Sequence, residues 1–306
     1  MAKEQLVVSS SPHVRSRTTV SNIMWSVVLS LVPAVIAAVY FFGANAFLII
    51  AVSIFGCLTT EFLFQKARGK EITINDGSAV ITGLLLALTL PPTASPWMVL
   101  VGSAVAIGLG KQVFGGLGHN PFNPALVGRA FLLVAYTEPM TDWVLDGVSS
   151  ATPLNVVAEA EYASVAYWDL FIGNVAGSLG ETSALALLLG ATYLIYKGYI
   201  NWRIPLGMLS TVFILSFLFG GDPVFHLFAG GLMLGALYMA TDMVTSPITK
   251  AGRWIFGIGA GFLVVIIRFY GGYPEGVLYA ILLMNTAVPL LNRYTRPRSF
   301  GEGGVR

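Results

Sequence analysis

The sequence predicts an all-α integral membrane protein with about ten transmembrane helices, arranged as two inverted five-helix repeats and carrying a longer extracytoplasmic loop. Three observations support this fold class: the composition, the apolar runs, and the distribution of Lys and Arg. Of the 306 residues, 56% are hydrophobic and only 10% are charged, and the mean hydropathy is +0.77. A chain with this composition cannot form one water-soluble globule.

The apolar runs give the number of helices. A membrane-spanning helix needs about 20 mostly apolar residues, and fewer where the helix is broken or re-entrant. The first run follows the polar segment SSSPHVRSRTT without a small-residue cleavage site, so we interpret it as a retained helix rather than a signal peptide. The runs lie at residues 23–42, 46–64, 79–90, 97–114, 124–135, 183–196, 204–219, 225–242, 254–270 and 276–292.

Lys and Arg give the orientation. If the N-terminus is cytoplasmic and all ten runs cross the membrane, every Lys and Arg except Arg129 and Arg268 falls in a cytoplasmic loop or terminus. The longest outer loop, 136–182, contains several Asp and Glu residues but no Lys or Arg. This asymmetry is the positive-inside pattern, and it predicts that both termini are cytoplasmic.

The loop divides the chain into two membrane halves. Five helices per half mean that related halves would be inverted in the membrane. In support, residues 79–92 align with 232–247 and residues 97–116 with 254–272, and the short third and fifth runs resemble discontinuous helices around a midplane site. The predicted parts are a cytoplasmic N-terminal segment (1–22), a first half (23–135), an extracytoplasmic loop (136–182), a second half (183–292) and a cytoplasmic tail (293–306).

The outer loop contains the polar segment DGVSSATP, in which Thr152 precedes Pro153. Thr is a good N-cap and Pro suits the first helical position, so the segment could simply begin a short surface helix. A helix N-terminus also presents free N–H groups to an anion, so a phosphate linked to Thr152 would be well placed there. Both interpretations remain open at this point.

A family resemblance bears on this segment. DGVSSAT is similar to the motif Asp-Gly-x-Ser/Thr-Gly/Ser-Ala-Thr, to whose last Thr an extracytoplasmic flavin transferase joins FMN through its phosphate. The stretches SPHVRS, TLPPTASP, GKQVFGGLGHNPFNPALVGRAFL and TDMVTSP resemble the RnfD subunits of Rnf complexes, and more distantly the NqrB subunits of sodium-pumping NADH:quinone reductases. The likeness covers nearly the whole chain. The resemblance implies covalent FMN on Thr152, with Asp146, Gly147, Ser149, Ser150 and Ala151 around it.

The resemblance also implies a function and a set of partners. It implies a flavin-carrying subunit of a translocating oxidoreductase in the bacterial inner membrane, not catalytic alone, which passes electrons between reduced ferredoxin and NAD and couples them to Na⁺ or H⁺ export. The implied partners are an extracytoplasmic FMN subunit, membrane subunits with an iron–sulfur centre, cytoplasmic subunits that react with NAD and ferredoxin, the flavin transferase and membrane lipid, but no nucleic acid. The single cysteine, Cys57, cannot hold an iron–sulfur cluster, so such a cluster must belong to a partner.

The stretch NPFNPALVGRAF supplies candidates for a second, non-covalent flavin, which the resemblance implies to be riboflavin. Asn120 and Asn123 each precede a proline, and their amides suit the pyrimidine edge of a flavin. They could instead cap the fifth helix and satisfy its broken backbone. With Arg129 on the same helix, they are the predicted cofactor-binding residues, and no metal site is predicted.

Ionisable residues inside apolar runs are costly and usually functional. Glu61 and Asp242 are therefore the candidates for the ion pathway. They could instead lie at helix ends beside interfacial water, or pair with Arg129. Two alternatives to the RnfD-like function also remain: an NqrB-like subunit, and a solute channel of the urea-transporter type, which would give the DGVSSAT motif no role.

The predicted topology can be tested by labelling. A Ser164→Cys substitution in a Cys57→Ser background should react with an impermeant maleimide in intact cells, because the acidic loop is predicted to face outward. Labelling that appears only after lysis would reverse the assignment.

Overall fold

The computed structural model of the chain describes residues 18–141, 143–145, 148–149, 154, 167–181, 183–271 and 276–297. Within these ranges the only strands, β1 (Val144–Leu145) and β2 (Val148–Ser149), form an antiparallel pair. The predicted all-α class is confirmed for the described residues, apart from this short pair. The helices are α1 (Val20–Ala67), α2 (Ser78–Leu88), α3 (Pro96–Ile107), α4 (Pro124–Ala135), α5 (Thr137–Thr141), α7 (Tyr167–Ile172), α8 (Ala184–Tyr196), α9 (Arg203–Leu218), α10 (Pro223–Phe228), α11 (Leu232–Leu234), α12 (Lys250–Tyr270) and α13 (Val277–Tyr294), with the 3-10 turn η1 (Ile74–Asp76) and the π-helical turns η2 (Gly108–Gln112) and η4 (Gly235–Met239).

Each predicted apolar run coincides with one or more of these helices. Among the described residues, α1 and α12 are long and apolar enough to cross a membrane, and α2, α4, α8 and α9 are shorter apolar helices. The number of membrane crossings and the inverted repeat remain predictions.

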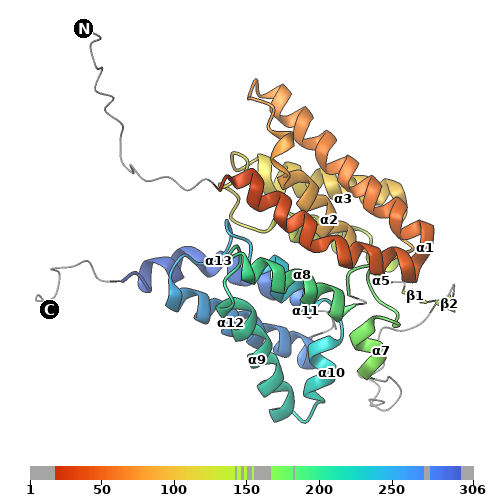
Figure 1. The fold of residues 1–306 in the computed structure, drawn as a ribbon, viewed down its shortest axis with the longest axis vertical. Coiled ribbons are helices and arrows are strands. Elements are labelled where there is room, and N and C mark those ends of the chain that lie inside the picture. Colours follow the sequence, from red (N-terminus) through yellow and green to blue (C-terminus); the bar gives the residue numbers. More distant parts are fainter. Residues whose placement is uncertain are drawn as a thin grey trace, which may run out of the picture.

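The first two apolar runs form one element, α1, which folds back on itself at Gly43. This glycine has a φ of +67° and a ψ of −148°, a backbone conformation that side chains with a Cβ rarely adopt. Figure 1 shows the red and orange arms of α1 diverging from this bend. The two predicted helices are therefore present as the arms of a hairpin.

The prediction that residues 225–242 form one continuous helix is wrong. The structure divides this run into α10, a break at residues 229–231, α11 and η4, because Gly230 has a φ of +70°. Arg268 of α12 stabilises the break, since its Nη1 donates to the His226 carbonyl (2.6 Å) and its Nη2 to the Ala229 carbonyl (2.9 Å). Terminal carbonyls of α10 are thus satisfied by a charged side chain in place of water.

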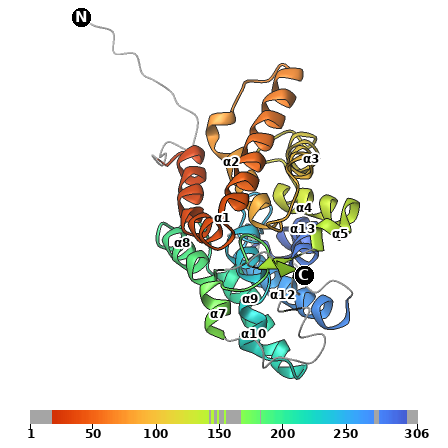
Figure 2. The same ribbon diagram turned by 90° about the vertical axis from the view of Figure 1, so that its right-hand side faces the viewer.

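The chain folds into two layers of helices that share one core. Helices α1 to α4 form one layer and α8 to α13 the other, as the two views in Figures 1 and 2 show. The layers are joined through the backbone: Leu179 N donates to Leu90 O (3.0 Å) and Gly180 N donates to Leu88 O (2.7 Å). These bonds satisfy carbonyls at the C-terminal end of α2, which therefore can end inside the protein.

Small residues let the helices of both layers approach closely. Gly190 of α8 contacts the Ser30 carbonyl of α1, and a methyl group at position 190 would overlap both that oxygen and the Tyr238 hydroxyl. The same hydroxyl lies 3.2 Å from the carbonyl oxygens of Ser30 and Leu187. Close contact through glycine is typical of helix packing in membranes, where apolar burial gives little driving force.

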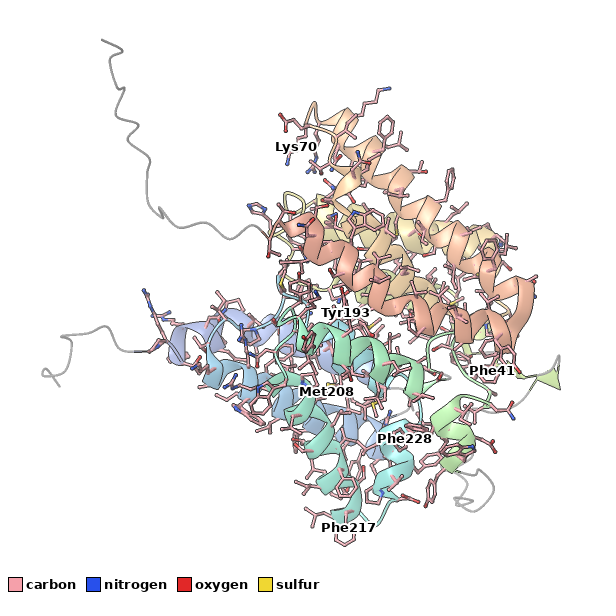
Figure 3. All side chains as sticks on the ribbon, viewed as in Figure 1. Phe41, Lys70, Tyr193, Met208, Phe217 and Phe228 are labelled. Atoms are coloured by element: carbon pink, nitrogen blue, oxygen red, sulfur yellow. The ribbon has the colours of Figure 1, made fainter. Side chains whose placement is uncertain are left out.

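The outer surface of the bundle is apolar, whereas many polar side chains are buried. Phe217, at the outer end of α9 in Figure 3, is 70% exposed, and Tyr196 at the end of α8 is 86% exposed. Glu61, Lys111 and Arg129, by contrast, are almost fully buried. An apolar exterior, with the few charged side chains of the bundle buried inside it, is the distribution expected of a protein surrounded by lipid.

The contact at Gly190 predicts the effect of a single methyl group. Gly190→Ala should lower the unfolding temperature of the purified protein in detergent, because the new Cβ overpacks the α1–α8 contact at a cost of about 1–3 kcal/mol. Gly207→Ala in α9 is the matched control, since a Cβ there meets its nearest neighbours at an ordinary 3.4 Å. Equal unfolding temperatures for both variants would show that the contact at Gly190 does not hold the layers together.

Candidate functional site

A cavity lies between the two layers. It has an empty volume of about 780 Å³, counting the space at its open mouth. The wall is mostly apolar with a few polar groups, which come from Ser78 and Thr82 of α2, Lys111 of η2, Asn120 and Asn123 before α4, Tyr199 after α8, Tyr238 of η4, and Thr241 and Asp242 after η4.

Asn120 presents an unused acceptor at this wall. The side chain is buried, and its Nδ2 donates to the Phe122 carbonyl at 3.1 Å. Its Oδ1 has no hydrogen-bond partner among the described residues. A buried unpaired acceptor costs about 1–3 kcal/mol, so Asn120 fits a ligand that donates a hydrogen bond into the cavity.

Asn123 has a structural role in addition to its place in the wall. It is the N-cap of α4, where its Oδ1 accepts from the Ala125 N–H at 3.0 Å. Its Nδ2 donates to the Met239 carbonyl in the opposite layer at 3.3 Å. Pro124 at the first helical position explains why the helix starts here. The capping interpretation is therefore confirmed for Asn123, whose amide has a partner on each side.

Asp242 lies in the cavity wall directly after η4. Its Oδ1 accepts from the Val244 N–H at 3.3 Å and its Oδ2 accepts from the Thr245 hydroxyl at 3.0 Å. In the part of the chain that the structure describes, no Lys or Arg is within ion-pair distance of it. Asp242 thus lines the cavity, and its carboxylate has neutral hydrogen-bond partners among the described residues.

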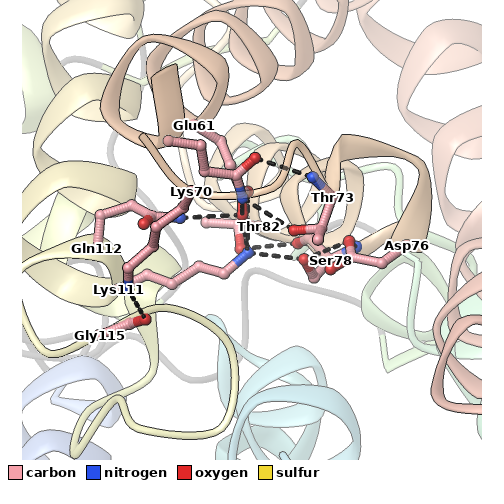
Figure 4. A network of polar contacts seen from close by, with 10 residues as sticks. Glu61, Lys70, Thr73, Asp76, Ser78, Thr82, Lys111, Gln112 and Gly115 are labelled. Carbon is pink, nitrogen blue, oxygen red and sulfur yellow. Dashed lines mark hydrogen bonds and ion pairs between the residues drawn. The ribbon is translucent and has the colours of Figure 1, made fainter. Parts of the chain in front are cut away.

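Glu61 forms an ion pair with Lys111, and not with Arg129. Lys111 Nζ lies 2.7 Å from Glu61 Oε1 and 2.8 Å from Oε2, and it also donates to Ser78 Oγ at 2.6 Å. Gln112 Nε2 donates to Glu61 Oε1 at 3.0 Å. Figure 4 shows these contacts converging from α1, α2 and η2. Lys111, which the distribution of basic residues assigned to a cytoplasmic loop, belongs to the π-helical turn η2, and its side chain is buried.

A second layer of contacts holds the partners of this pair in place. Gln65 Nε2 donates to Thr73 Oγ1 at 2.9 Å, and the Thr73 N–H donates to Gln65 Oε1 at the same distance. Asp76 Oδ1 accepts from both the N–H (2.8 Å) and the hydroxyl (2.6 Å) of Ser78. Gln65 and Ser78, which contact Glu61 and Lys111, are thus themselves held by Thr73 and Asp76.

Arg129 is not part of the cavity wall. It lines a smaller cavity, with an empty volume of about 350 Å³, together with Thr89, Glu181 and Met239. Its Nη1 contacts Met140 Sδ at 3.1 Å and its Nη2 lies 3.4 Å from the Met140 carbonyl oxygen. The structure therefore brings Asn120, Asn123 and Asp242 to one cavity and places Arg129 at another.

Most of the DGVSSAT motif lies outside the described residues. This applies to Thr152, Asp146, Gly147, Ser150 and Ala151. Ser149 is part of β2, where its backbone pairs with Val144.

The sequence interpretation missed Lys111 as a site residue. Its signal was present, because the apolar run from Trp97 continues with Val113 and Phe114 after the lysine. A basic residue inside an apolar run is as costly to bury as an acidic one, and it is therefore an equally good indicator of a site. Ser78, Tyr238 and Thr241 gave no comparable signal, since single hydroxyl groups are common in membrane helices.

Comparisons with known proteins identify the family. Residues 7–301 match the model of the NQR2, RnfD, RnfE family. The chain is 49% identical to a subunit of the proton-translocating ferredoxin:NAD(+) oxidoreductase complex of Clostridium ljungdahlii, with 98% of this chain and 97% of that protein covered. It is 48% identical to a subunit of the Na(+)-translocating ferredoxin:NAD(+) oxidoreductase complex of Acetobacterium woodii, over 100% and 98% of the two chains. It is also 40% identical to a subunit of the ion-translocating oxidoreductase complex of Methanosarcina acetivorans, with 96% of each chain covered.

Both the family match and these identities extend over nearly the whole sequence. They confirm the resemblance that the motifs indicated, and the chain belongs to the NQR2, RnfD, RnfE family.

Proposed function

We propose that this protein is the flavin-carrying membrane subunit of a complex that passes electrons between reduced ferredoxin and NAD and couples the transfer to ion export. The observation that carries the proposal is the near full-length similarity to single subunits of two ferredoxin:NAD(+) oxidoreductase complexes. The same similarity favours this function over an NqrB-like role in quinone reduction. A solute channel is disfavoured, because the relatives are named as oxidoreductase subunits.

The cavity between the layers is the proposed site of a non-covalent flavin, riboflavin. Its wall is mostly apolar with a few polar groups, and Asn120 Oδ1 is a buried acceptor without a partner among the described residues. A flavin would supply the redox chemistry there, while the protein supplies orientation and electrostatics. Asn120 would accept from the ring's imide N–H, and Lys111 would place a positive charge at the wall.

The second proposed cofactor is FMN joined through its phosphate to Thr152. The support is the similarity of DGVSSAT to the acceptor motif, and the position of this segment in an acidic loop predicted to face outward. The FMN would exchange electrons with a partner subunit outside the membrane, while the cavity flavin would lie nearer the cytoplasmic face.

Glu61 and Asp242 are the proposed ion-pathway residues. Each is a carboxylate within the bundle, and Asp242 lines the cavity directly. Two relatives of nearly equal identity are named for different ions, H⁺ and Na⁺. The common fold would therefore serve either ion, and a few side chains would select between them.

The proposed setting is the bacterial inner membrane. Ten spans in two inverted halves, with both termini in the cytoplasm, agree with the ten apolar runs, the two helical layers and the distribution of Lys and Arg. The partners would be the other subunits of the complex, which supply its iron–sulfur centres, the extracytoplasmic FMN, and the sites for NAD and ferredoxin. A flavin transferase would attach the covalent cofactor.

Replacement of Thr152 tests the covalent site. Thr152→Ala should abolish the fluorescent flavin band of this polypeptide on a denaturing gel, and with it electron transfer from ferredoxin to NAD. Replacement of a Thr N-cap by Ala costs only about 1 kcal/mol, so even in a capping role for Thr152 the variant should still assemble. Ser164→Ala in the same loop is the control and should fluoresce as the wild type does. A Thr152→Ala chain that still fluoresces would assign the flavin to another residue.

Replacement of Asn120 tests the non-covalent site. Asn120→Leu should lower the riboflavin extracted from the assembled complex by about tenfold, because the ring would lose a hydrogen-bond partner worth about 1–3 kcal/mol. The covalent FMN should remain. Asn22→Leu, at an exposed position of α1, is the control. Asn123→Leu should also lower the unfolding temperature, because it removes both a cap and a bond between the layers. Unchanged riboflavin in Asn120→Leu would contradict the proposed site.

A further inference from the structure

Lys111 lies between the cavity and Glu61. Lys111 and Ser78 are part of the cavity wall, whereas Glu61 lies behind them and does not line the cavity. The ammonium group has three N–H donors. Its contacts with the two oxygens of Glu61 and the hydroxyl of Ser78 use all three. Any additional negative group in the cavity would therefore compete with Glu61 for the same ammonium group.

The pair is shielded from water. The side chains of Lys111 and Glu61 are 2% and 1% exposed, so solvent and salt screen them very little. A change of charge in the cavity thus acts on Lys111 at nearly full strength. Because Lys111 touches both the cavity and Glu61, the pair is a direct electrostatic connection between the cavity wall and the acid behind it.

The backbone fixes Lys111 relative to the rest of the cavity. It belongs to the π-helical turn η2, a type of turn that often occurs at functional sites. Gly110 packs directly against Pro124, since a Cβ at position 110 would lie 2.9 Å from the Cα of Pro124. The backbone next to Lys111 is therefore packed directly against the start of α4, where Asn123 is the N-cap.

Glu61 keeps neutral hydrogen-bond donors of its own. Gln112 Nε2 lies 3.0 Å and Gln65 Nε2 lies 3.3 Å from Glu61 Oε1. If Lys111 moves toward a negative charge in the cavity, the carboxylate retains these donors but loses its counter-charge. A buried carboxylate in that state takes up a cation.

Lys111 and Asp242 are the two charged side chains in the cavity wall. Asp242 is an acid, so Lys111 is the one that would attract an anionic ligand.

We propose that Lys111 is a positioning residue that couples the charge of the ligand in the cavity to cation uptake at Glu61. The inference rests on the proposed flavin site. One electron from reduced ferredoxin, delivered by the partner subunits, adds one negative charge to the cavity. Lys111 then stabilises that charge and releases Glu61, which binds one monovalent cation. Electron and cation enter together, so the net charge of the site is unchanged.

The test is a comparison of how tightly the assembled complex holds riboflavin in its oxidised and dithionite-reduced states. It is made at an alkaline pH at which the ring, reduced by two electrons, gains one proton and therefore one net negative charge. Released riboflavin is measured by chromatography, so covalent FMN does not contribute. Lys111→Met should raise the dissociation constant of reduced riboflavin at least tenfold relative to the oxidised form, whereas Lys111→Arg should keep the wild-type ratio. Glu61→Gln should shift the ratio the opposite way, because it leaves the lysine without its counter-charge. This second shift should disappear in the Lys111→Met background.

Lys66→Met is the matched control. It removes one positive charge from the same layer at an exposed position with no contact to Glu61, and it should leave the ratio unchanged. If Lys111→Met prevents assembly, Lys111→Gln gives the same comparison with a neutral side chain that still forms hydrogen bonds. A wild-type ratio in the neutral variants, or a Glu61→Gln shift of equal size in both backgrounds, would overturn the inference. A wild-type complex with no extractable riboflavin would instead overturn the proposed flavin site.

Discussion

Helices that end inside this bundle must have their terminal N–H and C=O groups satisfied by the protein itself. An unsatisfied backbone group costs several kcal/mol in an apolar medium, so each break needs a specific partner. The C-terminal carbonyls of α2 receive bonds from Leu179 and Gly180, those of α10 from Arg268, and the N-terminus of α4 is capped by Asn123. Each of these partners comes from, or reaches toward, a different segment of the chain. The breaks therefore define how the two layers fit together.

The cavity forms where such breaks meet. Helix α4 begins beside η2, and η4 ends opposite them, so irregular backbone from both layers surrounds one space. Short helices leave room for polar side chains that a continuous apolar helix would exclude. Lys111 and Glu61 tolerate burial because each satisfies the charge of the other and the surrounding amides and hydroxyls complete their hydrogen bonds. Asn120 differs from them, because one of its two polar atoms has no partner among the described residues.

The sequence predicted the helices better than it predicted their breaks. The ten apolar runs coincide with helices because apolar length is a local property, and the bend at Gly43 falls in the short gap between the first two runs. The break at Gly230 was missed because glycine in an apolar run is equally compatible with close helix packing, as at Gly190. The cavity could not be predicted as a whole, since its wall combines residues from Ile23 to Val244. Arg129 was grouped with Asn123 because they are near in sequence, but six residues along a helix separate them by about 9 Å.

The contact between Gly190 and Ser30 limits how far the two layers can move relative to each other. Because α8 and α1 touch at backbone level and Tyr238 bridges the same point, the two layers cannot slide or spread here without breaking several contacts at once. The spacing of the two layers is therefore set by backbone contact at this point and does not depend on the rotamers of large side chains. Long side chains at the same contact could change rotamer, and the spacing would then vary.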